Sequence, residues 1–494
     1  MAPSPFASAT ELAGLVRHKD VTAVELTRLY LDRIQTLNPA LHAIVVHNRD
    51  AALRTAQDLD RELGAGTVRG PLHGVPVTVK ESFNIAGLKT TVNFPPVKNN
   101  VASADAWVVR ELGAAGACVL GKTNVPTLLA DVQTFGPLYP TANNPYDVSR
   151  TPGGSTGGGA AAVAAGLTTI EIGSDIGGSL REPAHFCGIF GLKPTENAAL
   201  HGKGHVPPLP GARGGFTAME SIGALARTMD DIALAWSVIN QPTWSRLGHL
   251  PARPCIKAEA REYRVAWFDD IGRVTCDQAT RHAVASFIGR LEAAGVTCEK
   301  RPFEQAWLDE AYAIWCVLFG AVLGQDASWI VRQVMKWQFM RIARGSVVDA
   351  SPIRAGLALN FTAVSRALKR RVDLVADLER RFEDYDFIVS PVAAGPAFRH
   401  NPRHEPVAID NRTMAYADYV APYTTIYNSG GNPVLVVPVG QTDQGLPIGV
   451  QIAAAHYAED DLIHFGRLAE QLGARFRPPT LPASREAGTC SSAT

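Results

Sequence analysis

The sequence predicts an α/β protein in which helices cover both faces of a large β-sheet. Short apolar segments rich in β-branched residues indicate strands. Between them lie segments with helix start signals or with apolar residues at helical spacing. Strands and helices that alternate along a chain are typical of this fold class. With 494 residues and 46% hydrophobic content, the chain can also bury a sizeable core.

The N-terminal half begins the alternation. Residues 22–25 (Thr-Ala-Val-Glu) form a capping box, which predicts a helix that ends at residues 38–39 (Asn-Pro). A second helix is expected over residues 103–114, and a small-residue helix suited to tight packing over residues 160–165. The strands expected here are residues 43–47, 75–80, 117–120 and 169–172.

The C-terminal half continues the same pattern. A helix is expected over residues 280–294. The apolar run at residues 311–324 predicts either a buried helix or a helix that lines an apolar substrate pocket. The polar tail over residues 482–494 is expected to be loosely held. The strands expected here are residues 264–268, 296–301, 387–390 and 434–439.

Charge and cysteine content exclude several classes of function. Lys+Arg and Asp+Glu both number 47, so the chain lacks the basic excess of a general nucleic-acid-binding protein. Its 7 cysteines include no C-x-x-C, which argues against a disulfide framework and a zinc ribbon. No apolar run reaches the roughly 18 to 20 residues of a membrane span, and the N-terminus lacks a secretory signal. We therefore expect a cytoplasmic protein with no nucleic-acid partner and no membrane span.

Two well-known motifs occur in the wrong context. Residues 116–123 match G-x-x-x-x-G-K-[ST], but the residues between the glycines are strand-like, so a sheet would use the amides that a phosphate needs. Residues 153–157 match G-x-S-x-G, yet a proline-containing loop precedes them where a nucleophile elbow needs a strand. His201 and His205 have no further ligand at metal spacing, so no metal site is expected.

The segment 173–179, Gly-Ser-Asp-Ile-Gly-Gly-Ser, carries the first candidate chemistry. Two glycines directly before Ser179 allow consecutive amides to turn toward one point, as an oxyanion hole requires. A helix expected from Leu180 onward adds amide dipoles. The same Gly-Gly-Ser sequence is also compatible with an ordinary turn.

Two more residues become candidates through their surroundings. Ser155 lies in the segment 152–158, whose glycines permit backbone conformations that other residues avoid, although a flexible loop has the same composition. Lys80 ends a strand, where a lysine is usually a solvated charge. If Lys80 is buried instead, its pKa falls from ~10.4 and the amine can act as a base near neutral pH. A serine hydroxyl needs such a base to become a nucleophile.

Taken together, these segments resemble the amidase signature family. The resemblance covers nearly the whole chain, and the spacing of Lys80, Ser155 and Ser179 also looks like that of family members. The matching segments are Leu-His-Gly-Val-Pro-Val-Thr-Val-Lys (72–80), Gly-Lys-Thr-Asn (121–124), Asn-Pro-Tyr-Asp (144–147), Phe-Cys-Gly-Ile-Phe-Gly-Leu-Lys-Pro-Thr (186–195) and, more weakly, Gly-Leu-Pro-Ile-Gly-Val-Gln (445–451).

The resemblance implies the amidase signature fold, a mixed and twisted sheet covered by helices on both faces. It implies one domain over residues 1–494, in which residues 72–195 are the catalytic block. Residues 240–380 are expected to be variable and to form the substrate pocket. No cofactor and no metal is implied. The oligomeric state is left open, with a homodimer as one option.

The resemblance also implies the roles of a serine hydrolase. Ser179 is the nucleophile, Ser155 is a bridging serine held by a preceding cis peptide bond, and Lys80 is the base that takes the proton through Ser155. The remaining implied residues are Thr156, Asp175 and Arg181, which support the loop, and the backbone amides of Ile176, Gly177, Gly178 and Ser179, which form the oxyanion hole. The chain departs from the family pattern at Glu81, Thr156 and Gly159, and none of these departures removes a catalytic group.

The expected reaction is the hydrolysis of a small-molecule carboxylic amide to a carboxylate and an amine, with esters and carbamates as further candidates. Leu128 and Leu129 lie in a region that lines the acyl pocket in family members, although a plain core role is open. Together with Trp315, Phe319 and Trp337, they indicate an apolar or aromatic substrate.

An alternative function is that of the glutaminase chain in a tRNA-dependent amidotransferase. That branch of the family holds the ammonium group of glutamine with an aspartate at a fixed position before an Asn-x-x-Gly motif. Here residues 428–431 provide the motif, and the position before it holds Ala421, which cannot bind an ammonium group. A shifted alignment would bring Asp418 into that place instead.

Overall fold

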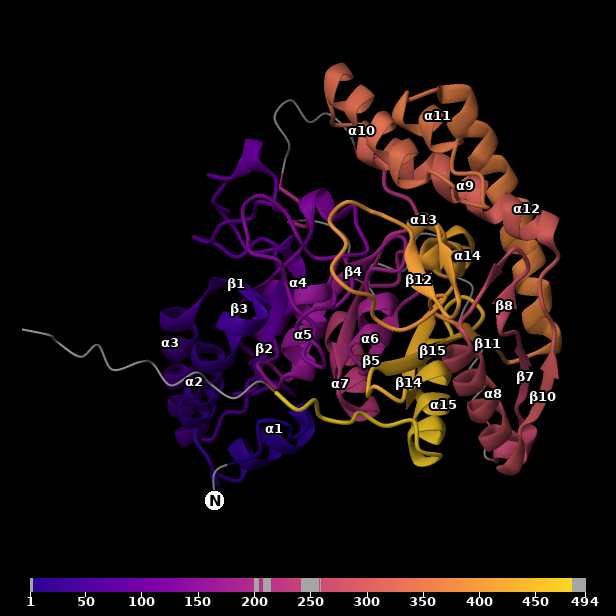
Figure 1. The fold of residues 1–494 in the computed structure, drawn as a ribbon. Helices are drawn as coiled ribbons and strands as arrows, with labels where there is room; N and C mark the ends of the chain where they lie inside the picture. The colour runs from indigo at the N-terminus through magenta and orange to yellow at the C-terminus, as the bar shows by residue number, and fades with distance from the viewer. Residues whose placement is uncertain (1–2, 200–203, 208–214, 241–256, 258, 482–494) are drawn as a thin grey trace, which may run out of the picture.

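A mixed sheet forms the centre of the protein, as the sequence predicts. The computed structural model describes residues 3–199, 204–207, 215–240, 257 and 259–481 (Figure 1). Within them lies an 11-stranded sheet that contains both parallel and antiparallel pairs. The strands follow one another across the sheet in the order β1 (Ile44–His47), β3 (Cys118–Thr123), β2 (Pro76–Lys80), β4 (Ile170–Asp175), β6 (Ser221–Ala226), β5 (Phe190–Lys193), β14 (Val434–Gln441), β15 (Pro447–Ala453), β11 (Phe387–Pro391), β7 (Arg264–Trp267) and β10 (Thr297–Lys300).

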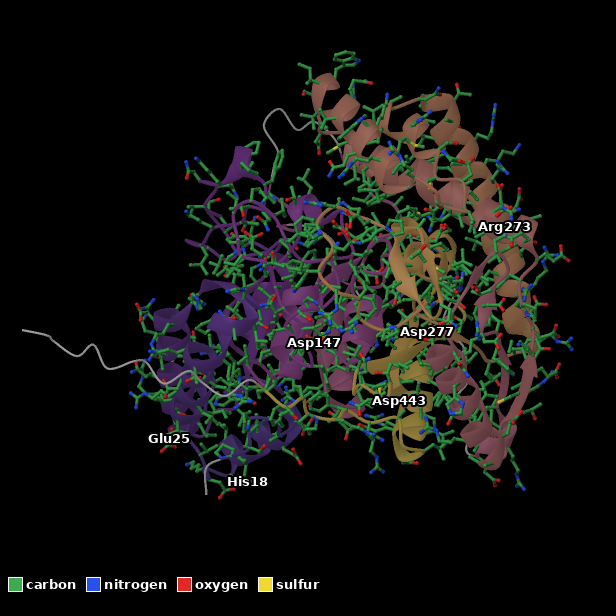
Figure 2. All side chains as sticks on the ribbon, viewed as in Figure 1. His18, Glu25, Asp147, Arg273, Asp277 and Asp443 are labelled. Carbon is green, nitrogen blue, oxygen red and sulfur yellow. The ribbon has the colours of Figure 1, made fainter. Side chains whose placement is uncertain are left out.

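Helices cover both faces of this sheet, as expected. Side chains along β2 alternate between the two faces of the sheet. Val77 and Val79 belong to the core on one face, so Thr78 and Lys80 point to the other. Charged side chains such as Glu25 and Arg273 lie at the periphery (Figure 2). The core on the first face contains residues of α4 (Trp107–Ala114), α7 (Met229–Ile239), α8 (Gln278–Ala293) and α15 (Glu459–Gln471), and the clusters on the second face contain residues of α2 (Ala23–Leu41), α3 (Arg49–Gly64), α5 (Gly157–Ala164) and α6 (Arg181–Phe186).

A group of helices packs beside the sheet and lies above it on one side in Figure 1. Its central member is α9 (Gln305–Gly324), which packs against several other helices of the group. Among the described residues, α9 is the one helix long and apolar enough to span a membrane, and 61% of its most apolar stretch is buried inside the protein. Helix α9 is therefore largely buried, and some of its side chains also line the cavities at Ser179 described below. The other members are α10 (Trp329–Ile342), α11 (Ile353–Leu357), α12 (Phe361–Asp384), α13 (Tyr416–Tyr419) and α14 (Ala421–Gly430).

The remaining elements are short. A first helix, α1 (Ala9–Arg17), begins at a capping box formed by Ser8 and Glu11. Two small hairpins and three 3₁₀ turns complete the description: β8 (Asp270–Ile271) with β9 (Val274–Thr275), β12 (Val407–Ile409) with β13 (Arg412–Met414), and η1 (Pro95–Val97), η2 (Thr127–Leu129) and η3 (Ala260–Glu262). The five cysteines within the described residues form no disulfide.

Several predicted boundaries were wrong. Helix α2 does not end at Asn38-Pro39 but runs to Leu41, because the proline lies in the last turn and left-handed His42 closes the helix. Helix α4 begins at Trp107 and not at residue 103. Strands β3 and β4 are longer than expected, since both continue through polar residues that pair with neighbouring strands. The division of the chain into blocks stays a prediction, and the tail over residues 482–494 lies outside the described residues.

Candidate active site

Lys80 is a buried amine at the end of a central strand. Its side chain is fully buried, and Nζ donates hydrogen bonds to Ser155 Oγ at 2.8 Å, to Ser174 O at 3.1 Å and to Ser174 Oγ at 3.1 Å. Burial lowers the pKa of Lys80 to about 7, although Asp175 and other acidic residues oppose this shift. The amine is therefore suited to take up and release a proton near neutral pH.

Ser155 lies in the glycine-rich segment that leads into α5, and its side chain is 1% exposed. The peptide bond between Gly154 and Ser155 is cis, as the resemblance implies. The next residue joins this segment to the Ser179 loop, because the Thr156 amide donates to Ser179 O at 3.1 Å. Thr156 Oγ1 also donates to Ser174 O at 3.4 Å. The segment is thus tied in place and is not a free loop.

Ser179 follows β4 and precedes α6. It lies beside Ser155 in one cavity, described below, but no hydrogen bond joins the two hydroxyls among the described residues. The amides of Ile176, Gly177 and Ser179 donate to no protein acceptor in the part of the chain that the structure describes. The Gly178 amide differs from the expected set, because it donates to Asp175 Oδ1 at 2.8 Å and is used inside the loop.

Asp175 and Arg181 hold this loop from within. Both side chains are fully buried, and Arg181 Nε and Nη2 contact the two carboxylate oxygens at 3.0 and 2.9 Å. Asp175 also accepts the Leu180 amide at 3.0 Å. Burial alone would raise the pKa of Asp175, but the charge and hydrogen bonds of Arg181 hold it below its usual value. Arg181 reaches further, to Thr424 O at 2.7 Å.

We expect Asp175→Asn to lower the free energy of unfolding by about 3–5 kcal/mol, because it leaves the buried Arg181 without its counter-charge. The free energy is measured by urea titration. Asp58→Asn is the matched control, since Asp58 pairs with Arg61 on the exposed surface, where such pairs contribute about 0–1 kcal/mol. Equal and small losses in both variants would contradict the bracing role of Asp175.

Two departures from the family pattern have structural explanations. A side chain at Gly159 would place Cβ 2.4 Å from Glu171 Cγ, so the glycine makes room for that carboxyl group. Glu171 accepts hydrogen bonds from Thr78 and Thr123 at 2.5 and 2.6 Å, and burial raises its pKa to about 8. Glu81 turns away from Lys80 to accept the Val92 amide at 2.8 Å. Glu81 therefore binds a neighbouring loop.

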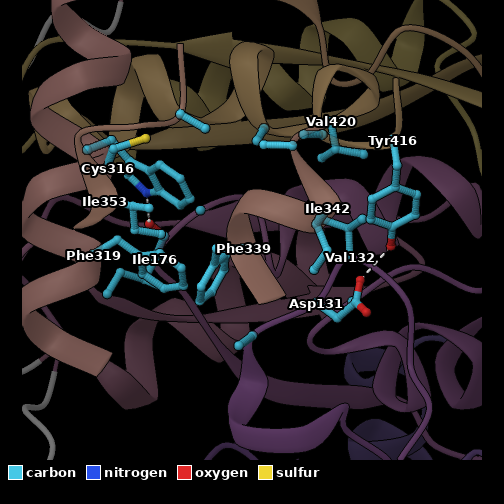
Figure 3. Close-up of a pocket in the computed structure, with 18 of the residues that line it drawn as sticks. Asp131, Val132, Ile176, Cys316, Phe319, Phe339, Ile342, Ile353, Tyr416 and Val420 are labelled. Atoms are coloured by element: carbon cyan, nitrogen blue, oxygen red, sulfur yellow. Dashed lines mark hydrogen bonds between the residues drawn. The ribbon is translucent and has the colours of Figure 1, made fainter. Parts of the chain in front are cut away.

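Two cavities meet at Ser179. The first, which we call the apolar cavity, has apolar or aromatic side chains over most of its wall (Figure 3). The second, which we call the polar cavity, is lined by Ser155 and Ser174 and by the charged residues Glu220 and Asp326. Residues shared by the two cavities include Leu129, Ile176, Ser179 and Phe319.

The structure places the predicted substrate-pocket residues unevenly. Leu129 lines both cavities and Leu128 lines the polar cavity. Trp315 and Phe319 line the apolar cavity and stack with a ring-centroid distance of 4.6 Å. Trp337 was wrongly grouped with them: its side chain is 67% exposed and lines neither cavity. On an amphipathic helix a tryptophan on the outer face cannot be told from one on the inner face by composition alone.

The two candidates for an ammonium-binding position are also resolved. Ala421 lines the apolar cavity, so the wall there carries a methyl group. Asp418 does not line either cavity, because its carboxylate accepts hydrogen bonds from Ser346 Oγ and from the Val347 amide. A shifted alignment therefore does not bring Asp418 into the cavity.

The sequence reasoning missed one contact and one residue at the site. It named Trp315 for the substrate pocket but not for its hydrogen bond to the Ser179 loop, and it did not name Asp131. Trp315 Nε1 donates to Ile176 O at 2.8 Å and so fixes the peptide group that carries the Gly177 amide. Asp131 is a carboxylate in the wall of the apolar cavity, where it accepts a hydrogen bond from Tyr416. Its position shortly after Leu128 and Leu129 was the available signal, since those residues were assigned to the pocket.

The comparison with known proteins identifies the family of the chain. The family model described as Amidase matches residues 25–463. An acylamidase of Rhodococcus erythropolis is 31% identical over 459 residues, which cover 91% of this chain and 92% of that protein. The A chain of the glutamyl-tRNA(Gln) amidotransferase of Acidothermus cellulolyticus is 31% identical over 501 residues, with 94% of each chain covered. The solved structure of the peptide amidase PAM with the inhibitor chymostatin is 25% identical, has a TM-score of 0.76, and covers 96% of this chain and 100% of its own.

Proposed function

This chain belongs to the amidase signature family of hydrolases, which act on carbon–nitrogen bonds, and from that premise we propose that it hydrolyses linear carboxylic amides through an acyl intermediate on Ser179. The observation that carries the proposal is the 2.8 Å hydrogen bond between Lys80 Nζ and Ser155 Oγ in a fully buried setting. A lysine whose pKa is about 7 can act as a general base there. No cofactor is part of this mechanism.

The proposed proton path has two steps. Neutral Lys80 accepts the proton of Ser155, and Ser155 accepts the proton of Ser179 as the Ser179 oxygen bonds to the carbonyl carbon. The carbon–nitrogen bond then breaks, and the proton returns through Ser155 to the leaving amine. Water then attacks the acyl carbonyl carbon and gives its proton through Ser155 to Lys80. The bond to the Ser179 oxygen breaks, the proton returns through Ser155 to that oxygen, and the acid leaves as the carboxylate. The Ser155 and Ser179 hydroxyls need only move closer to each other when substrate binds, since catalytic hydrogen bonds often shorten in the complex.

The proposed oxyanion hole consists of the amides of Ile176, Gly177 and Ser179. These amides lie at the cavity wall and have no protein acceptor among the described residues. Amides held in this way can stabilise the negative charge that develops on the carbonyl oxygen. Trp315 holds the Ile176 carbonyl, and Thr424 Oγ1 donates to the Gly177 carbonyl at 2.7 Å. The Trp315 contact thus fixes the peptide group that carries the Gly177 amide, and the Thr424 contact fixes the next peptide group, which carries the Gly178 amide.

We expect Gly177→Ala to lower kcat by about 10²–10³-fold, the loss typical of one missing oxyanion donor. An added Cβ would lie 2.9 Å from Trp315 Cζ2, and Trp315 is held between Tyr312 and Phe319, so the Ser179 loop must shift instead. Steady-state kinetics on an amide substrate measure the effect. Gly289→Ala is the matched control, because nothing lies within 4 Å of its added Cβ. A kcat equal to wild type in both variants would contradict the proposed oxyanion hole.

The proton path also decides which side of the substrate enters which cavity. Ser155 must deliver a proton to the leaving amine, and Ser155 lines the polar cavity. The amine therefore lies on that side, and the acyl group enters the apolar cavity between Trp315, Phe319 and Phe339. Flat apolar walls of this kind bind aromatic or alkyl groups. We propose a small amide with an apolar or aromatic acyl group as the substrate.

We further propose that the enzyme acts without a partner protein. The alternative role, as the glutaminase A subunit of a tRNA-dependent amidotransferase, needs partners for both charges of glutamine. Ala421 offers none to the ammonium at the position where that branch carries an aspartate, and none of the described residues that line the apolar cavity is a cation that could pair with the carboxylate. Asp418 is held by Ser346 and Val347 outside the cavity. The acylamidase and the amidotransferase chain are equally similar to this protein, at 31% identity each, so the choice between the two functions depends on activity.

The experiment is a substrate panel with the purified chain alone. Phenylacetamide, hexanamide and L-glutamine are incubated with enzyme, and released ammonia is measured. We expect release from the first two and none from glutamine. Ammonia from glutamine alone, and only after addition of the other amidotransferase chains, would favour the alternative function.

A further inference from the structure

Asp131 is the one charged side chain among the described residues that line the apolar cavity. Figure 3 shows its carboxylate at one end of the cavity beside Tyr416, while Phe319 and Phe339 lie toward the other end. The Asp131 side chain is 14% exposed, and it lines both the apolar cavity and a separate hollow beside Phe135 and His404. A carboxylate in such a wall costs free energy unless it has hydrogen-bond partners.

Two protein groups hold this carboxylate in position. Tyr416 donates its hydroxyl proton to Asp131 Oδ1, because the Tyr416 oxygen already accepts a hydrogen bond from Gln133 Nε2 at 2.9 Å. His404 Nε2 lies 2.7 Å from Asp131 Oδ2. A carboxylate can accept about four hydrogen bonds, so Tyr416 and His404 leave acceptor positions on Asp131 free while they fix its orientation. A carboxylate that is already held in one orientation can bind a donor selectively, because little ordering is needed on binding.

The position of Asp131 relative to the scissile bond determines what it can bind. The cavity is also lined by Ser179 and by Gly154, which precedes Ser155. An acyl group whose carbonyl lies at Ser179 extends into the apolar cavity, and its far end can reach the carboxylate. Since a carboxylate only accepts hydrogen bonds, the complementary group on the substrate is a hydrogen-bond donor, and a charged N–H group makes the strongest such bond.

We propose that Asp131, oriented by Tyr416, is the recognition group of a distal subsite that binds an N–H donor at the far end of the acyl group. This inference rests on the proposed function, because it assumes that the acyl group occupies the apolar cavity. The substrate class is then an aromatic or alkyl amide that carries an ammonium or a neutral N–H group away from the scissile carbonyl. The competing role is structural, in which Asp131 only holds Tyr416 and His404 in place.

Binding to Ser179→Ala protein, measured by titration calorimetry, tests this subsite without turnover. The probes are two pairs: 4-(aminomethyl)phenylacetamide against phenylacetamide, and indole-3-acetamide against 1-methylindole-3-acetamide. We expect the donor-bearing member to bind about 10- to 100-fold more tightly in the first pair, and by a smaller factor in the second, as hydrogen bonds to charged groups imply. Asp131→Asn in the same background should bring the first ratio to within about threefold of one.

Asp418→Asn is the matched control, because that buried carboxylate lies on the same helix as Tyr416 but lines neither cavity. It should leave both ratios unchanged. Tyr416→Phe should lower the first ratio partly, since Asp131 keeps His404 but loses its second anchor. Equal affinities within each pair, no binding of either member, or ratios unchanged by Asp131→Asn would each overturn the subsite.

The subsite and the proposed function fail in different ways. Labelling of wild-type Ser179 by a serine-reactive fluorophosphonate, with affinity ratios near one, removes the subsite and leaves the hydrolase. Affinity ratios as expected, without labelling of Ser179, remove the nucleophile and leave the binding site.

Discussion

Ser179→Ala is expected to lower kcat/KM for amide hydrolysis by about 10⁵–10⁶-fold, the scale of losses when a triad nucleophile is removed. The expected loss is this large because an alanine cannot form the acyl-enzyme, while the amides of the Ser179 loop stay in place and retain only their small share of catalysis. Initial rates of ammonia release at amide concentrations below KM measure the change, with a detection limit set by long incubation of concentrated enzyme.

Ser237→Ala is the matched control for this loss. Ser237 is an exposed serine on α7 whose hydroxyl donates to Leu234 O. It takes no part in the proposed chemistry. Its kcat/KM should equal that of wild type within about twofold, since this hydrogen bond is not part of the proton path. A Ser179→Ala enzyme that keeps more than about a hundredth of wild-type activity would rule out an acyl intermediate on Ser179.

Lys80→Met is expected to lower kcat/KM by about 10⁴-fold or more, because the apolar side chain fills the same space and cannot accept a proton. In wild type, the base must be neutral, and its pKa is about 7. Above this value Lys80 is neutral and active; below it Lys80 is protonated, so kcat/KM should fall about tenfold for each pH unit. A pH profile from about 5 to 9 measures the inflection.

Lys193→Met provides the control for this profile. Lys193 is also fully buried, and burial lowers its pKa to about 7, but it donates to Ser221 and to backbone carbonyls and touches neither Ser155 nor Ser179. Its variant should keep the wild-type inflection. A flat wild-type profile across this range, or an inflection that Lys193→Met removes, would show that Lys80 is not the base.

Much of the fold follows from local signals in the sequence. The capping box at Thr22 does begin α2, and each predicted strand corresponds to a strand of the sheet. The errors fall where tertiary pairing overrides local composition. Strand β3 continues through Lys122 and Thr123 because those residues pair with Val79 and Lys80. The local pattern of apolar residues does not predict this extension.

The site depended more strongly on the family resemblance. Taken alone, the residues around Ser155 are as typical of a flexible loop as of a rigid segment, and a lysine at a strand end is usually solvated. Burial of Lys80 and its hydrogen bond to Ser155 are products of the packing of α5 against β2, which single residues do not encode. Likewise, the use of the Gly178 amide by Asp175 is a matter of loop geometry.

Intact-protein mass after exposure to a serine-reactive fluorophosphonate tests the central claim most directly. Wild-type protein should take up one adduct, at Ser179, and Ser179→Ala should take up none. Lys80→Met should react far more slowly, since the base that activates the hydroxyl is gone. Folded wild-type protein that gains no adduct, or a Ser179→Ala variant that is labelled as fast as wild type, would contradict the assignment of Ser179 as an activated nucleophile.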